Sequence, residues 1–261
     1  MTPAAASLDP RTTLARPDLA EQALEGIVRA AAFRVATAMH CAVPVADIHA
    51  GSVAGDHPVD QLIFGEAFDV LDASGDQAWG RARRDGVVGW VRMAALREGA
   101  PLPTHRIGST SDALPLNALV NEMGDPAGLA PIGSFAADPV EVAERLLGTP
   151  YLLGGRSSLG TDCCGLVQQA LYACGRAAPR YADQQAALGE PVSGADARRG
   201  DLVIWLDADE GPWNGHAGFM LDGDRVLHAV GRLGGVVIEP FAEADARHRT
   251  PGSAGPVIRR I

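Results

Sequence analysis

The sequence has few of the features that mark several common classes of protein. Only four cysteines occur in 261 residues, and no two of them form a Cys-x-x-Cys pair. Neither the disulfide framework of a small secreted domain nor a structural zinc site is therefore expected. No run of 18 apolar residues occurs, so a membrane-spanning helix is not predicted.

Basic clusters are also missing from the sequence. The net charge is −10, from 22 basic and 32 acidic residues, and no run of five basic residues occurs. Such a chain is a poor candidate for binding nucleic acid or an anionic membrane. The first 33 residues lack a basic head followed by an apolar core, so a secretory signal is not predicted. We therefore expect a cytoplasmic location.

The length and composition suit two modest domains with many turns. Hydrophobic residues make up 47% of the chain, which is enough for a core in each domain, and the 31 glycines and 18 prolines indicate short elements. Residues 1–40 are predicted to be a helical leader. Its helix is expected at about residues 18–33, which are rich in Ala and Leu.

Residues 41–98 differ from the leader in having short apolar runs separated by turn residues. Asp85 and Gly86, between two such runs, are typical of a β-hairpin. Several short strands at this spacing predict a small β-barrel. Residues 99–136 are rich in Pro, Gly and Ser, and we interpret them as a linker or a truncated second barrel.

The last predicted domain, residues 137–261, contains two adjacent cysteines at a helix start. Asp162 is the expected N-cap, and apolar residues then recur at offsets of 0, 3, 4, 7, 8 and 11 from Cys163, as in an amphipathic helix. Unpaired N–H groups and the helix dipole favour a thiolate at Cys163. Cys164 points about 100° away. Either cysteine could instead be a small core residue.

Residues 215–230 are predicted to form a hairpin that carries two histidines. If its turn centres near residue 222, His216 and His228 lie opposite each other, with Cβ atoms about 4.5–5.5 Å apart. One imidazole can then act as a base while the other fixes its orientation. Five further histidines are expected at the surface, in loops or at element ends: His40, His49, His57, His105 and His248. A cysteine at a helix start, packed against such a sheet, indicates a cysteine hydrolase.

These motifs resemble the NlpC-type peptidoglycan endopeptidases over residues 137–244. The resemblance rests on TPYLLGGRSSLGTDCCGLVQQAL, ARRGDLVIW, GHAGFMLDGDRVLHA and IEPFAEA, in this order. LIFGEAFDVLD and DGVVGWV resemble the bacterial Src-homology-3-like domains that precede such catalytic domains in cytoplasmic murein-peptide recycling enzymes. The resemblance implies an α+β chain. A small all-β Src-homology-3-like barrel would precede a papain-like domain, whose N-terminal Cys helix packs on an antiparallel sheet.

The resemblance also implies roles for individual residues. Cys163 would be the nucleophile, His216 the general base and His228 the residue that orients the base. Four further residues would hold the oxyanion or the substrate: Tyr151, Asp162, Cys164 and Glu66, the last as a candidate carboxylate for a substrate amine. No metal or organic cofactor is implied.

The implied substrate is a small peptide from the murein stem. The bond cleaved joins γ-D-glutamate to a diamino acid, diaminopimelate or lysine, and the recycling branch favours a free N-terminal L-Ala. The implied reaction is hydrolysis by acyl transfer through a thioester on Cys163.

The sequence departs from the family at five positions of the predicted pocket. They are Cys164 in place of Ser, Leu153 in place of Trp, Tyr181 and Ala182 in place of Asp and Ser, and Val87 in place of Tyr. An acidic insertion at residues 207–214 precedes His216. Because the catalytic set is complete, we expect retained cysteine chemistry with shifted specificity. A murein-peptide binding module without turnover, or a Cys-His amidase or acyltransferase on another substrate, is the alternative.

Overall fold

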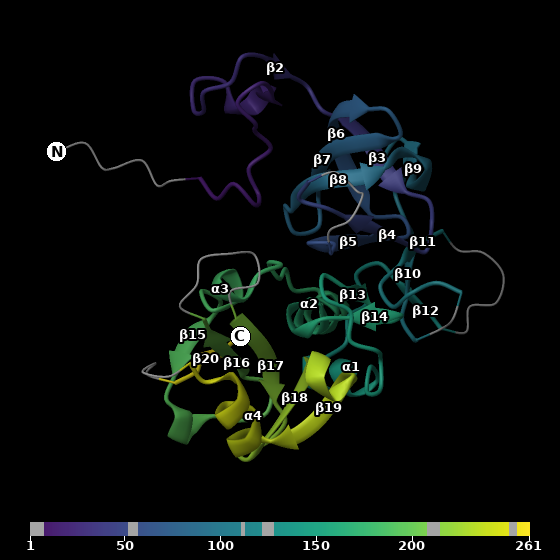
Figure 1. Cartoon of the computed structure of the whole chain (residues 1–261). Helices are drawn as coiled ribbons and strands as arrows, with labels where there is room; N and C mark the ends of the chain where they lie inside the picture. Colours follow the sequence, from purple (N-terminus) through teal and green to yellow (C-terminus); the bar gives the residue numbers. More distant parts are fainter. Residues whose placement is uncertain (1–7, 52–56, 111–112, 122–127, 208–214, 251–254) are drawn as a thin grey trace.

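The computed structural model describes residues 8–51, 57–110, 113–121, 128–207, 215–250 and 255–261. It confirms an α+β chain in which a small all-β domain precedes a domain with a Cys-bearing helix on an antiparallel sheet (Figure 1). The acidic insertion lies outside the described residues except for Asp207. Within the described ranges, no helix is both long and apolar enough to cross a membrane.

The all-β domain consists of a five-stranded sheet and a two-stranded ribbon. The sheet, in the order β8-β7-β6-β3-β9, contains β3 (Thr37–Cys41), β6 (Ala67–Ser74), β7 (Gln77–Ala82), β8 (Val88–Arg92) and β9 (Leu96–Glu98), and the ribbon pairs β4 (Val45–Ile48) with β5 (Asp60–Ile63). A short 3-10 turn, Met93–Ala95, precedes β9. Gly86, with φ of +88°, forms the predicted turn between β7 and β8. Ile48, Leu62 and Phe68 are fully buried in the core.

The predicted leader helix is wrong. The segment instead contains β1 (Ala20–Glu21), a 3-10 turn (Gln22–Leu24) and β2 (Phe33–Arg34), with β1 and β2 parallel. Leu19 is buried with Trp79 of the barrel, and Gly26 has φ of +81°, which a continuous helix excludes. Packing of the leader against the barrel therefore overrides the helix propensity of its Ala and Leu residues.

Residues 99–136 contain a small antiparallel sheet that contacts both domains. Its strands are β10 (His105–Ile107), β11 (Leu119–Val120) and β12 (Leu129–Pro131), in the order β11-β10-β12. The N–H of Leu119 donates to the carbonyl of Phe64 in the barrel. The guanidinium of Arg106 donates to the carbonyl of Ala173, 3.1 Å away, at the end of the cysteine helix.

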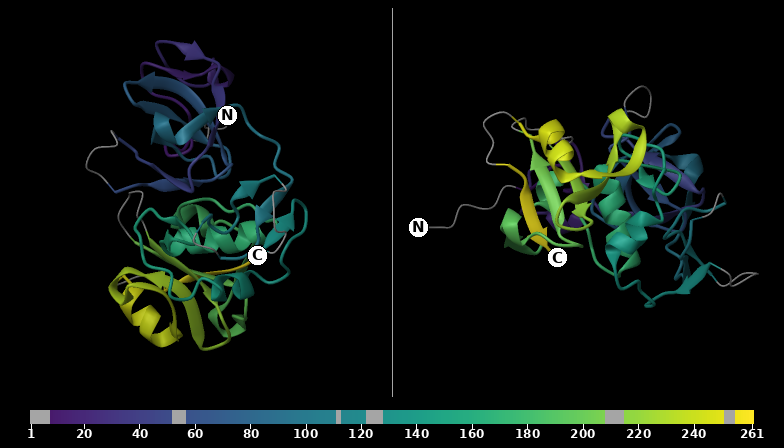
Figure 2. Two further views of the ribbon diagram at one scale, coloured as in Figure 1. Left: turned by 90° about the vertical axis from the view of Figure 1, so that its right-hand side faces the viewer. Right: turned by 90° about the horizontal axis from the view of Figure 1, so that it is seen from below.

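The C-terminal domain is built on a six-stranded antiparallel sheet, β15-β20-β16-β17-β18-β19. Its strands are β15 (Glu190–Val192), β16 (Leu202–Leu206), β17 (Gly215–Met220), β18 (Arg225–Val230), β19 (Gly235–Pro240) and β20 (Val257–Arg260). The other elements are α1 (Pro139–Glu144), β13 (Arg156–Ser157), β14 (Gly160–Thr161), α2 (Cys163–Ala173), α3 (Ala182–Gln185), α4 (Phe241–His248) and the 3-10 turns Gly194–Asp196 and Gly231–Leu233. The apolar stripe of α2 packs on β17 and β18. Figure 2 shows the teal and green segments that include α2 between the barrel and this sheet.

A buried ionic network joins the barrel to the C-terminal domain. Arg156 of β13 is fully buried and lies 3.1 Å from Asp60 and 2.6 Å from Glu66, both of the barrel. Its backbone N–H also donates to the side chain of Gln61, 2.8 Å away. These contacts fix the loop that leads into α2 against the barrel.

We expect Arg156→Met to lower the free energy of unfolding by about 3 kcal/mol, because it removes the buried cation that two buried carboxylates share, although each keeps a second arginine as a neighbour. Chemical denaturation followed by circular dichroism measures this loss. The matched control is Arg225→Met, which removes an exposed pair with Asp222 and is expected to cost about 1 kcal/mol or less. Equal effects of the two substitutions would contradict the role given to the network.

Candidate active site

The start of α2 holds Cys163 in a fixed position. Asp162 has extended backbone angles, and its carboxylate accepts from the N–H of Gly165 at 2.8 Å, as an N-cap does. A Cβ on Gly165 would lie 2.2 Å from the carbonyl oxygen of Gly155, so only glycine fits where the helix packs on the preceding loop. Cys163 is therefore in the first turn, as predicted, with 7% of its surface exposed.

His216 on β17 and His228 on β18 lie on the same face of the sheet, but the predicted register is wrong. Phe219 of β17 pairs with Leu227 of β18. The pairing of the two strands is therefore shifted by two residues from the register that was predicted from the position of the turn. The two histidines are therefore diagonal neighbours, still within reach of long side chains. His216 Nε2 and His228 Nδ1 lie 2.9 Å apart and share a hydrogen bond.

Glu239 of β19 is a further member of this site that the sequence analysis missed. Its Oε1 lies 2.8 Å from His228 Nε2 and also contacts Arg247. A carboxylate at Nε2 favours the tautomer with its proton there, so we infer that His228 Nδ1 accepts from His216 Nε2. The Nδ1 atom of His216 is then the nitrogen left to take a proton. Glu239 lay inside IEPFAEA, but no spacing rule singled it out.

Both histidines are neutral at pH 7. Burial, followed by the neighbouring His248 and His228, holds the pKa of His216 well below its ordinary value. Burial also lowers the pKa of His228 to about 4, although Glu239 acts in the opposite direction. His216 can therefore serve as a base.

One cavity of about 180 Å³ brings most of the predicted site residues together. Its lining residues are Tyr151, Leu153, Asp162, Cys163, Cys164, Arg180, Tyr181, Ala182, Gly215 and His216. His228 lies behind His216 and is fully buried, in keeping with an orienting role. The arrangement places a thiol, a neutral imidazole and a phenol around one small space, which suits nucleophilic attack on a carbonyl group.

Tyr151 and Cys164 both remain protonated beside the nucleophile. Burial raises the pKa of Tyr151, so its phenol can donate a hydrogen bond. The contact with Cys163 and burial raise the pKa of Cys164 well above its ordinary value. The two sulfur atoms are 3.9 Å apart. Cys164 is thus a neutral wall of the cavity next to Cys163.

The structure contradicts the expectation that Glu66 binds a substrate amine. Its carboxylate is 2% exposed, contacts Arg84 at 2.9 Å and Arg156 at 2.6 Å, and accepts from the N–H of Ile63. Glu66 is not among the residues that line the cavity. It lies in the interface between the domains, where the two arginines neutralise it.

Arg180 is a buried residue of the cavity wall that the sequence analysis did not single out. It donates to both carboxylate oxygens of Asp162, one of them at 3.0 Å, and its Nε lies 2.9 Å from Asp60 of the barrel. Arg180 therefore connects the cap of α2 to the barrel. Its carboxylate partners could not be found from sequence, because Asp60 and Asp162 are both distant along the chain.

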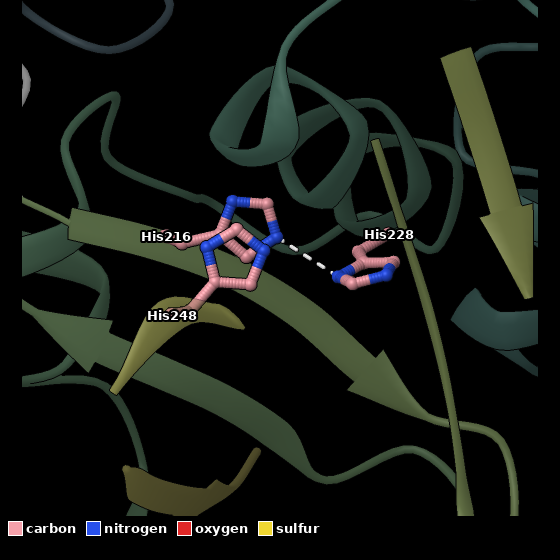
Figure 3. A group of neighbouring side chains, drawn as sticks. All are labelled: His216, His228 and His248. Carbon is pink, nitrogen blue, oxygen red and sulfur yellow. Dashed lines mark hydrogen bonds between the residues drawn. The ribbon is translucent and has the colours of Figure 1, made fainter. Parts of the chain in front are cut away.

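His248, expected at the surface, stacks on His216 instead (Figure 3). The ring centroids are 3.7 Å apart and the planes differ by 4°. Together with His228 they form a group whose possible metal-ligating atoms all lie within 4.8 Å of one another. His49 is also buried rather than exposed, with 6% of its surface accessible, and its backbone pairs with that of Trp90.

Comparisons with known proteins agree with this arrangement. Residues 148–252 match the model of the NlpC/P60 family, and residues 55–96 match that of the bacterial dipeptidyl-peptidase Sh3 domain. A crystal structure of an NlpC/P60 family protein from Bacillus cereus has a TM-score of 0.66 to this chain, at 17% identity, and covers 86% of this chain and 99% of its own. It shares the fold.

Two curated relatives resemble part of the chain. A probable endopeptidase of Haemophilus influenzae is 42% identical over 91 residues, which are 34% of this chain and 55% of the relative. A gamma-D-glutamyl-L-lysine dipeptidyl-peptidase of Bacillus subtilis is 34% identical over 94 residues, which are 36% of this chain and 32% of the relative. The matched region thus spans about half or less of each relative.

Proposed function

Since the chain carries an NlpC/P60 domain together with a bacterial Sh3 domain, we propose that it is a cysteine peptidase acting on murein peptides. The bond that it cleaves joins γ-D-glutamate to a diamino acid in peptides with a free N-terminal L-Ala. We further propose that it acts in the cytoplasm, in the recycling of cell-wall peptides.

One observation carries the proposal. Cys163 and His216 line the same cavity, and His216 shares a 2.9 Å hydrogen bond with His228 through the ring nitrogen that is not needed for proton transfer. A binding module without turnover has no requirement for a thiol and an oriented, neutral imidazole at one cavity. The arrangement therefore favours catalysis over the binding alternative.

The chemistry follows from the placement of these groups. His216 Nδ1 takes the proton of the Cys163 thiol, and the thiolate attacks the carbonyl carbon of the γ-glutamyl amide. The N–H of Cys163 and the phenol of Tyr151 donate to the oxyanion. His216 returns the proton to the leaving amine, which leaves a thioester on Cys163. A water molecule, deprotonated by His216, then attacks the thioester carbonyl. The C–S bond breaks, the acid is released, and His216 returns the proton to the sulfur of Cys163.

The name of the Bacillus subtilis relative supports the choice of a γ-D-glutamyl bond. The position of the barrel supports a short substrate, because Tyr181 packs in the core of the barrel and also lines the cavity. Arg180 also lines the cavity and contacts Asp60 of the barrel. Tyr181 and Arg180 therefore form a wall on one side of the cavity that the barrel supports. A peptide bound at Cys163 would meet this wall within a few residues.

Substrate specificity tests this proposal. The protein is incubated with L-Ala-γ-D-Glu-meso-diaminopimelate, its N-acetylated form, and the isomer with an α-linked glutamate. Release of diaminopimelate from the first peptide, and at least tenfold slower release from the other two, is expected. Equal rates on all three would contradict the substrate assignment. Transfer of the acyl group to an added amine, with no free acid formed, would assign the acyltransferase alternative instead.

Glu239→Gln is expected to lower kcat by about 10- to 100-fold, because it removes the charge that contacts His228 Nε2 at 2.8 Å and orients this ring, an interaction worth about 1.5–3 kcal/mol. The KM is expected to stay within about twofold, since Glu239 does not line the cavity. The control is Glu243→Gln, an exposed carboxylate on α4. A change in KM alone would show that Glu239 does not act through the imidazole pair.

A further inference from the structure

We propose that His216, His228 and His248 form an inhibitory site for Zn²⁺, with His248 supplying the ligand that the peptidase reaction does not use. The three rings come from different elements, β17, β18 and the last residue of α4, and lie next to one another (Figure 3). The effect on activity rests on the proposed function, whereas binding of the metal does not.

His248 has a nitrogen atom available for a ligand. Its Nε2 is buried and has no hydrogen-bond partner among the described residues. A buried polar atom of this kind normally has a partner, so an unpaired one needs a reason. His248 stacks on a face of the His216 ring and His228 meets this ring edge-on, with ring centroids 3.7 and 5.0 Å from it.

The distances suit one metal ion after a small rearrangement. Two imidazole nitrogens bound to a tetrahedral Zn²⁺ at about 2.0–2.1 Å are about 3.3 Å apart. His216 Nε2 and His228 Nδ1, at 2.9 Å, are close to this spacing, and the possible ligand atoms of all three residues lie within 4.8 Å. The parallel rings of His216 and His248 have to splay so that their lone pairs converge. His248 can move because it ends α4 and is partly exposed.

The chemistry of the donors selects the ion. Three neutral imidazoles and one open position for water are a common ligand set for catalytic Zn²⁺. Glu239, 2.8 Å from His228 Nε2, provides the carboxylate that usually orients a metal-bound histidine. The group of three histidines contains no sulfur ligand. An ion bound to it can therefore be distinguished from an ion bound to the thiolate of Cys163.

Binding of the ion would remove the base. In the free protein the proton of neutral His216 is on Nε2, between the two imidazoles. Zn²⁺ takes the Nε2 lone pair, so the proton of the still neutral ring moves to Nδ1. Nδ1 then has no lone pair for the thiol of Cys163. The ion also replaces the hydrogen bond through which His228 orients His216.

Calorimetric titration of Cys163→Ala with Zn²⁺ tests the binding directly, and this inactive variant makes the result independent of the proposed function. We expect one ion per chain. Combining His248→Gln with Cys163→Ala is expected to weaken Zn²⁺ binding at least tenfold. Loss of a residue that only orients a metal ligand already weakens metal binding about tenfold or more, and loss of the ligand itself should cost at least as much. The matched control His105→Gln, a histidine of β10, is expected to leave the affinity unchanged.

Co²⁺ provides a readout that needs no histidine variant. Bound to the wild-type chain, it is expected to give visible d–d bands without a thiolate-to-metal charge-transfer band, and it should inhibit peptide hydrolysis reversibly. A charge-transfer band that disappears in Cys163→Ala would overturn the proposal, because the ion would then be on the thiolate. Failure of Cys163→Ala to bind Zn²⁺, or equal affinity after the loss of His248, would also overturn it.

Discussion

Replacing Cys163 with alanine is expected to lower kcat on L-Ala-γ-D-Glu-meso-diaminopimelate by about 10⁴-fold or more, the effect of removing a nucleophile from a catalytic triad. Steady-state release of diaminopimelate measures it. The KM is expected to change little, because Cys163 is 7% exposed and contributes little area to the cavity. Substrate binding by the variant, followed by calorimetry, verifies that the cavity is intact.

The neighbouring cysteine provides the matched control. Cys164 is in the same turn, is 6% exposed and lies 3.9 Å from Cys163, but its raised pKa keeps it a thiol. Cys164→Ser restores the residue that the family usually has, and kcat is expected to stay within about tenfold of wild type. If Cys164→Ser were as inactive as Cys163→Ala, the assignment of the nucleophile would be wrong.

His216→Gln is the second substitution with a large expected effect. It removes the base but keeps a polar side chain of similar size on β17, and kcat is expected to fall by about 10³- to 10⁴-fold. The rate at which iodoacetamide alkylates Cys163 should fall in parallel, because the imidazole no longer takes the thiol proton. This rate is measured by mass spectrometry of the cysteine-containing peptide.

A double substitution separates a shared mechanism from two independent effects. Because the nucleophile and the base act as a unit, Cys163→Ala combined with His216→Gln is expected to be about as slow as Cys163→Ala alone. A multiplicative loss in the double variant would mean that His216 does not act on Cys163.

The sequence predicted the parts of the fold that depend on local patterns. The cap at Asp162, the apolar stripe from Cys163 and the Asp-Gly turn at Gly86 each follow from residues close in the chain, and the structure contains all three. The leader could not be predicted in this way. Its Ala and Leu residues are good helix formers, and packing against barrel residues far along the chain, among them Leu71 and Trp79, selects the non-helical form.

The same distinction applies to the site. Cys163 and His216 were found because their roles depend on a helix start and a hairpin, but the register of that hairpin was wrong by two residues. The missing members, Glu239 and His248, contact the histidines from β19 and α4. No spacing rule links those elements to the hairpin, so only the folded chain shows that they belong together.

The central proposal is that Cys163 hydrolyses the γ-D-glutamyl bond of a murein tripeptide. The most direct test is to incubate the purified chain with L-Ala-γ-D-Glu-meso-diaminopimelate and to follow free diaminopimelate by mass spectrometry, with Cys163→Ala in parallel. Release by the wild-type chain and none by the variant is the predicted result. The absence of release from both, or equal release from both, would contradict the claim.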